Sequence, residues 1–253
     1  MPIQQMLLGI PAPASGGAAI ETNGLIAYWD AIPANVSNEY VSDTSGNGWS
    51  SVEAKWSGAA QSHYNANRNG GAFECPNKST AYNYFDLGDP ITFGTGGSNN
   101  QGTEFTFFIG IKYPSGVADS YGMFFTGQDG DNFIGQSVGG GWRIDSNQDQ
   151  KADASGTDIG TGINVIYVTM NSNGYVEYYL NGSEDANCYY KSSSGQWSGD
   201  NIILNSMNCY GAPGANMSYA SAHYWYFSGV YNRVLTATEI ASNTAIHNTR
   251  LGI

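Results

Sequence analysis

Carboxylate spacing decides whether this chain could act as a glycoside hydrolase or lyase. A retaining hydrolase needs two carboxyl groups about 5–5.5 Å apart, one as nucleophile and one as acid. Glu177 stands alone in a strand-like run, and Glu184-Asp185 follows an Asn-Gly turn that would orient neither carboxylate. Asp145 supplies a single carboxylate, and none of the three histidines accompanies a Ser or Cys in a triad context. We predict a protein that is not an enzyme, with a glycoside hydrolase or lyase as the alternative.

One short segment has the composition of a metal site. Asp129, Asp131 and Asn132 surround a glycine, and calcium prefers closely spaced carboxylate and amide oxygens. The segment lacks the full EF-hand pattern. A plain turn is the alternative, because Asp and Asn also hydrogen-bond their own backbone. Calcium is the one cofactor that the sequence suggests.

Several large aromatic residues stand beside Gly, Ser and Asn instead of inside apolar runs. An exposed ring can stack on a sugar while neighbouring polar groups bind its hydroxyls. The candidates for such carbohydrate contacts are Trp49, Trp56, Tyr64, Trp142 and Trp197. The alternative is that these rings plug the open ends of a β-sandwich.

The cysteines predict neither a disulfide framework nor a zinc site. There are three of them, Cys75, Cys188 and Cys209, an odd number without CxxC spacing. One bridge between Cys188 and Cys209 is possible, and buried thiols are the alternative.

The charge of the chain limits the classes of partner that we expect it to bind. The formal net charge is -12 and charged residues make up 12% of the sequence. Nucleic acids and anionic membranes both require a basic surface, so neither is an expected partner. No apolar run approaches the roughly 20 residues that span a bilayer. The abundant Asn, Ser, Thr and Gly residues favour a neutral polar surface that suits sugar recognition.

Residues 1–22 differ in composition from the rest. An apolar cluster that includes Met6, Leu7 and Leu8 precedes a Pro/Ala/Gly-rich linker. Large apolar side chains are costly to leave in water, which favours an assembly arm that inserts into a partner. A frayed end that covers a sheet edge is the alternative. The segment lacks a basic start and a long apolar stretch, so we do not expect a signal peptide.

The first nine residues, MPIQQMLLG, resemble the starts of virion structural proteins from tailed phages, particularly phages of cyanobacteria and marine bacteria. The resemblance implies a location in the virion, after assembly in the host cytoplasm. It also implies binding to other virion proteins, or to copies of this chain, through residues 1–22. The alternative is secretion.

From residue 23 to 253 the pattern is that of one all-β domain. Residues 103–112 are apolar on both faces, as expected for a central strand. Asn-Gly pairs mark turns, and the pair at 173–174 predicts a hairpin of residues 163–170 and 175–180. No period runs through the 34 glycines, which argues against a repeat protein.

One short helix is predicted near residues 236–248. Thr236 can be its N-cap, and Glu239 three residues later completes a capping box. The helical period places Ile240, Thr244 and His247 on the inner face, with Ile246 beside them.

The strand that runs into this helix, in residues 227–241, resembles the closing motif of laminin-G-like, concanavalin A-type domains. Residues 24–30 resemble the opening strand of that family and residues 43–48 the turn after it. Residues 71–74 together with 84–88 resemble its next hairpin. The resemblance implies a two-sheet antiparallel jelly-roll sandwich. Glucanases with this fold carry a Glu-x-Asp-x-x-Glu run, which this sequence lacks.

These observations together predict a structural protein of a tailed-phage virion that is not an enzyme. It would decorate the capsid or belong to a tail fibre, and its lectin-like domain would adhere to host-surface glycans. A secreted bacterial carbohydrate-binding lectin domain is the alternative.

Overall fold

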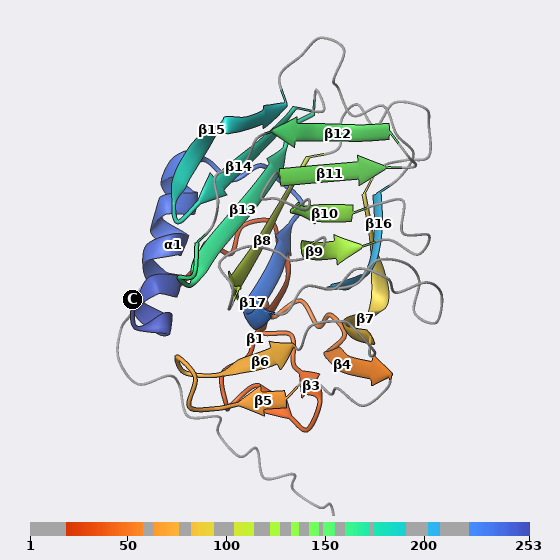
Figure 1. The fold of residues 1–253 in the computed structure, drawn as a ribbon, viewed down its shortest axis with the longest axis vertical. Helices are drawn as coiled ribbons and strands as arrows, with labels where there is room; N and C mark the ends of the chain where they lie inside the picture. Colours follow the sequence, from red (N-terminus) through yellow and green to blue (C-terminus); the bar gives the residue numbers. More distant parts are fainter. Residues whose placement is uncertain are drawn as a thin grey trace, which may run out of the picture.

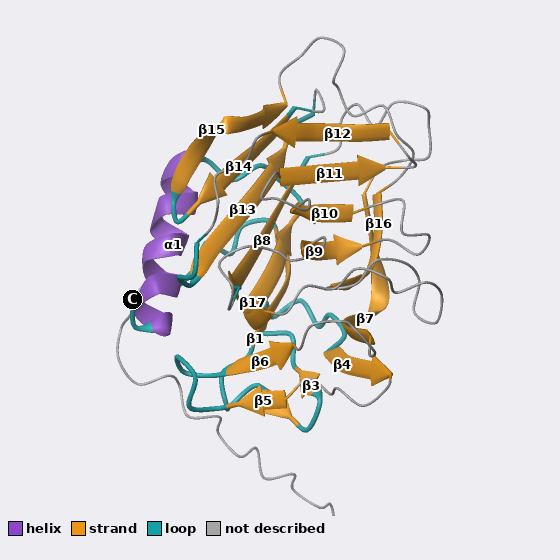
Figure 2. Cartoon of the chain, viewed as in Figure 1, coloured by secondary structure: helices purple, strands orange, loops and turns teal. Residues whose placement is uncertain are grey.

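The computed structural model describes residues 19–57, 63–75, 82–93, 104–113, 122–126, 133–136, 142–146, 149–154, 160–172, 175–190, 202–207 and 223–253. These residues form two antiparallel β-sheets that face each other, and one C-terminal helix (Figures 1 and 2). This arrangement confirms the predicted all-β jelly-roll sandwich with one short C-terminal helix.

The eight-stranded sheet has the order β15-β14-β13-β8-β17-β6-β5, and β1 also pairs with β17. Its strands are β1 (Leu25–Asp30), β5 (His63–Asn65), β6 (Ala72–Cys75), β8 (Phe105–Lys112), β13 (Asn164–Met170), β14 (Val176–Leu180), β15 (Ser183–Tyr190) and β17 (His223–Tyr231).

The nine-stranded sheet has the order β12-β11-β10-β9-β16-β7-β4-β3-β2. Its strands are β2 (Val36–Ser37), β3 (Tyr40–Val41), β4 (Val52–Ser57), β7 (Tyr82–Phe93), β9 (Gly122–Thr126), β10 (Phe133–Gln136), β11 (Trp142–Ser146), β12 (Asp149–Ala154) and β16 (Ile202–Met207).

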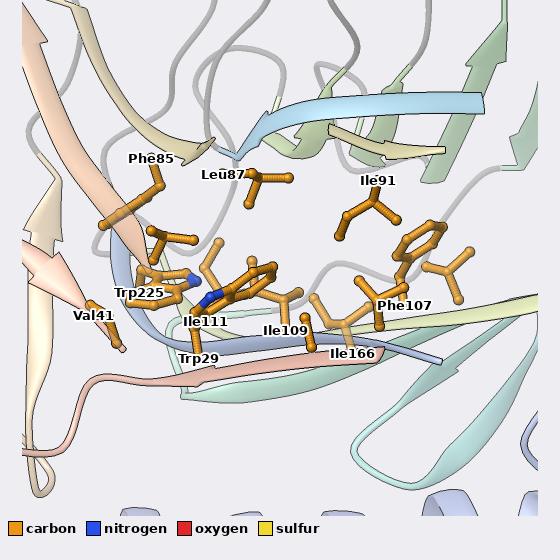
Figure 3. Close-up of a cluster of buried hydrophobic side chains, with 14 of the residues drawn as sticks. Trp29, Val41, Phe85, Leu87, Ile91, Phe107, Ile109, Ile111, Ile166 and Trp225 are labelled. Atoms are coloured by element: carbon orange, nitrogen blue, oxygen red, sulfur yellow. The ribbon is translucent and has the colours of Figure 1, made fainter. Parts of the chain in front are cut away.

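The main hydrophobic core fills the space between the sheets (Figure 3). Aromatic rings of the two sheets meet there: Phe85 of β7 lies 4.6 Å from Trp225 of β17, measured between ring centroids. Trp29 is fully buried and its indole N–H donates to the carbonyl of Ser50. Burial of such rings is the main driving force for joining two sheets.

Helix α1 (Ala237–Leu251) covers the outer face of the eight-stranded sheet. The predicted capping box is confirmed, with Thr236 and Glu239 bonding to each other's backbone N–H. Ile240, Thr244 and His247 are buried, as the helical period predicts. The helix has 15 residues, and no helix in the described part of the chain is long and apolar enough to cross a membrane.

His247 lies flat against the sheet. Its ring stacks on Phe227 at a centroid distance of 4.0 Å and an interplanar angle of 16°. Its Nε2 is buried and has no hydrogen-bond partner among the described residues. Burial, with the Arg250 charge as a smaller cause, lowers the pKa of His247 to about 3.

Arg250 connects the C-terminal end of α1 to β1 by hydrogen bonds and an ion pair. Its Nε and Nη2 donate to Asp30 Oδ1 at 3.0 and 2.6 Å. Its Nη1 donates to the carbonyl of Asn69 at 2.9 Å, and Nη2 also donates to that of Gly71 at 3.1 Å. We call Asp30 and Arg250 the helix clamp. Burial raises the pKa of Asp30 although the Arg250 guanidinium opposes the shift.

The strand pairings test the local predictions. β8 lies between β13 and β17, with seven of its eight residues buried, so the predicted central strand is confirmed. The hairpin of β13 and β14 is also confirmed, with Met170 opposite Val176. At the next turn, Asn181 and Gly182 both have positive φ, as a tight Asn-Gly hairpin turn requires.

One predicted hairpin is wrong. Residues 71–74 and 84–88 do not pair, because β6 belongs to the eight-stranded sheet and β7 to the nine-stranded sheet. Phe73 and Phe85 instead meet across the core, edge to face, at 5.4 Å. Their strands contact through side chains between the sheets and not through a backbone ladder.

Candidate carbohydrate-binding face

The outer surface of the nine-stranded sheet carries a polar row that includes the exposed ring of Tyr40. In β3, β4 and β7, alternate residues such as Val41, Ala54 and Leu87 are buried in the core. Their neighbours therefore face outward. We call the outward side chains of Tyr40, Glu53, Lys55 and Asp86 the tyrosine face.

Backbone register brings these residues together. Tyr40 lies opposite Glu53, and Glu53 lies opposite Asp86 on the next strand. Cross-strand partners have Cβ atoms about 4.5–5.5 Å apart, so their side chains can touch. Tyr40 is 44% exposed, whereas the large apolar residues of the main hydrophobic core between the sheets are buried.

Lys55 links the two carboxylates. Its Nζ lies 2.5 Å from Asp86 Oδ2 and 3.2 Å from Glu53 Oε2. The hydrogen bond to Asp86 is the main reason why the pKa of Lys55 is raised. A hydrogen bond to Glu53 likewise raises the pKa of Tyr40. The other oxygen of Asp86 accepts the backbone N–H of Gly88 at 3.0 Å, which fixes this carboxylate.

This arrangement provides several groups that can hydrogen-bond a ligand. Carboxylates directly opposite one another on neighbouring strands repel, and Lys55 compensates that repulsion. The face therefore offers acceptors, an ammonium donor and an aromatic ring on rigid strands. Such groups can hold a ligand rich in hydroxyls.

Two of the five predicted sugar-binding aromatics lie in the packed structure. Trp49 is half-buried against the main core, and its backbone N–H donates to Asp43 Oδ2 at 3.1 Å. Tyr64 packs 5.3 Å from Phe73, and its hydroxyl donates to the carbonyl of Ala31 at 3.0 Å. For these two residues the structure matches the packing alternative.

Two further aromatic candidates, Trp56 and Trp142, lie in strands of the nine-stranded sheet. The backbone of Trp56 pairs with Asn83 in β4 and β7. The backbone of Trp142 pairs with Gln136 and Ala154 in β11 and its neighbours. Trp197 lies outside the described residues.

The metal and assembly candidates also lie outside the described residues. These are Asp129, Asp131 and Asn132 for calcium, and Met6, Leu7 and Leu8 for assembly. Where the structure is described, no three His, Cys, Asp or Glu side chains gather as a metal site requires. Cys75 is buried at the end of β6, and Cys209 lies outside the described ranges.

Sequence reasoning missed Tyr40. It sits in a strand of two residues, too short for a period-2 pattern to be recognised. The available signal was Tyr40-Val41 between polar residues, which predicts one outward ring and one buried side chain.

Comparison with known proteins gives the fold. No family model and no curated protein matches the sequence. Among solved structures, Trypanosoma rangeli sialidase in complex with sialic acid matches with a TM-score of 0.58 and 13% identity, over 94% of this chain and 35% of the sialidase. The receptor binding domain of botulinum neurotoxin type G has a TM-score of 0.53 and 16% identity, over 89% of this chain and 52% of that domain.

A third structure matches along its whole length. Domain 4 of an extracellular arabinanase from Geobacillus stearothermophilus, in complex with arabinotriose, has a TM-score of 0.57 and 14% identity, over 89% of this chain and 100% of that domain. By contrast, the chain spans about a third of the sialidase and half of the toxin domain. Identities this low show the fold alone. The chain has a lectin-like, two-sheet β-sandwich fold.

Proposed function

We propose that the protein binds carbohydrate through the tyrosine face and does not turn it over. The observation that carries the proposal is the exposed ring of Tyr40 beside Glu53, Lys55 and Asp86 on adjacent strands. The ring can stack on the apolar face of a sugar. The three charged groups can bond its hydroxyls, and bonds to charged groups are the stronger ones.

Binding without turnover is supported by the state of the two carboxylates. Lys55 contacts both Glu53 and Asp86. The two carboxylates therefore do not act as a separate acid and nucleophile, which a retaining hydrolase requires. The resemblance in fold to an arabinanase domain solved with arabinotriose agrees with a saccharide ligand, by analogy only.

A shallow face of this kind gives weak binding. We expect a dissociation constant of about millimolar to micromolar at one site, because a stacked sugar gains little beyond the cost of ordering it. Several copies on one particle would raise the avidity without new contacts.

The proposal extends to where the protein works. The phage-like start of the sequence and the apolar cluster in residues 1–22 support a virion structural protein, attached by that segment and displaying the sandwich. A secreted bacterial lectin domain is the second candidate. Mass spectrometry of purified virions from the source phage would separate the two. Deletion of residues 1–20 should abolish particle attachment while the melting temperature stays nearly unchanged.

Replacement of Tyr40 by Ala tests the binding proposal. We expect the multimerised protein to bind neutral glycans on an array, and Tyr40→Ala to weaken binding about tenfold, since an aromatic contact is worth about 1 kcal/mol or more. Tyr40→Phe should keep most of the affinity because it keeps the ring.

The matched control is Tyr64→Phe, which alters a tyrosine that packs inside. It should bind like the unaltered protein. Equal binding by Tyr40→Ala, or an array without signal for the unaltered protein, would overturn the proposal. Release of reducing sugar from a bound polysaccharide would contradict the absence of turnover.

A further inference from the structure

A second aromatic and polar surface lies on the outer side of the eight-stranded sheet, where β5 and β6 extend past the end of α1 (Figure 1). Backbone register places Lys112 opposite Tyr224, Tyr224 opposite Glu74, and Glu74 opposite His63. The four residues therefore form one row across four strands. With Arg68 we call them the arginine face.

Arg68 occupies the centre of this face. Its guanidinium lies over the Tyr224 ring, with Cζ 4.0 Å from the ring centroid. Its Nε donates to Glu74 Oε1 at 2.8 Å, and Asn65 donates to the same oxygen at 3.1 Å. The side chain of Arg68 remains 32% exposed. Stacking and the single bond to Glu74 orient the guanidinium, and its terminal nitrogens have no acceptor among the described residues.

Tyr226 is the buried neighbour of this face. Tyr224 and Tyr226 both pack in the hydrophobic cluster on the outer side of the sheet, although a β-bulge interrupts β17 between Trp225 and Phe227. The Tyr226 hydroxyl is fully buried and has no hydrogen-bond partner among the described residues. Burial raises the pKa of Tyr226, while the charges of Arg68 and Arg250 oppose the shift. A buried hydroxyl without a partner destabilises the folded state, so its removal should not weaken the fold.

Charge separates this face from the rest of the described surface. The chain has a net charge of -12, and Arg250, Arg233 and Lys55 are paired with carboxylates. Among the described residues of the arginine face, Arg68 and Lys112 accompany one carboxylate, that of Glu74, which pairs with Arg68, and His63 lies at the end of the row. The local balance is therefore positive, in contrast to the tyrosine face.

We propose that the arginine face is a second binding site, for the carboxylate group of an acidic saccharide. The terminal nitrogens of Arg68 would bond the two carboxylate oxygens, as a planar guanidinium does well. Lys112, opposite Tyr224 in the same row, adds attraction for the anion. This site lies on the opposite sheet from Tyr40. An experiment can therefore disprove this second site without affecting the proposal for the tyrosine face.

The test is a titration of the full chain with digalacturonic acid at low salt, monitored through the amide chemical shifts of the protein. We expect shifts around residues 63–74 and 223–226, and weaker binding as salt is raised. Arg68→Gln should weaken binding about tenfold or more, because it removes a charge-assisted bond. Arg233→Gln, which removes a positive charge outside both faces, should leave this titration unchanged.

Tyr226→Phe is a control for the fold beside this face. It removes a buried hydroxyl that has no hydrogen-bond partner among the described residues, so the affinity should not change and the melting temperature without ligand should stay equal or rise. No shifts with digalacturonic acid, or equal affinity for Arg68→Gln, would overturn the proposal. Equal shifts with sodium acetate at the same concentration would also overturn it, because they would mean an anion site without preference for a saccharide.

Discussion

Replacing Arg250 by Met should lower the free energy of unfolding by about 3–5 kcal/mol, the usual effect of removing one partner of a buried ion pair. The helix clamp is largely shielded: the side chains of Arg250 and Asp30 are 13% and 9% exposed. Without the guanidinium, Asp30 would keep a buried carboxylate, and the carbonyls of Asn69 and Gly71 would lose their donor. The desolvation cost of that carboxylate makes the effect large.

Urea denaturation followed by circular dichroism measures this loss. Arg233→Met is the matched control, because its ion pair with Glu239 is more exposed and should cost less. The double variant Arg250→Met/Asp30→Asn should lose less free energy of unfolding than the sum of the losses of its two single variants. A loss below about 1 kcal/mol for Arg250→Met would show that the clamp contributes little.

Acidification should destabilise the protein through His247. Its folded-state pKa is lowered to about 3 from the ordinary 6.5, so only the unfolded chain binds a proton in between. The stability contributed by the neutral ring is therefore complete above about pH 6.5 and is lost as pH falls towards 3. Between pH 7 and pH 5 the loss should be about 2 kcal/mol.

His247→Phe is the variant that checks this expectation, since a phenyl ring can keep the stacking on Phe227. Urea midpoints at pH 7 and pH 5 should differ clearly for the unaltered protein and much less for the variant. Glu239 has its pKa lowered to about 2 and loses its contribution only below its ordinary value of 4.5, outside this window. Equal pH dependence of the two proteins would exclude His247 as the cause.

Local signals predicted the elements whose partners are close in sequence. Thr236 and Glu239 are three residues apart and fix the start of α1. The hairpin of β13 and β14 needs only a short turn between two β-rich runs. Turn chemistry and capping act over a few residues, so one sequence contains the whole signal.

Contacts between distant residues were not predictable in this way. Nothing in the sequence says that Arg250 will meet Asp30, 220 residues earlier. The same holds for Arg68 and Tyr224, which only the pairing of β6 with β17 brings together. The error about β6 and β7 has this origin, because alternation predicts strands but not the sheet to which each belongs.

The place of β17 sets a condition on how the chain folds. This strand pairs with β8 and β6 and also with β1, whose residues lie some 200 positions earlier. During synthesis, β1 cannot pair until β17 has been made, some 200 residues later. Pairings of such long sequence separation make folding slow and leave strand edges open meanwhile. The nascent chain would thus keep unpaired strand edges until β17 is made, and removing β17 would leave β1, β6 and β8 without the strand with which all three pair.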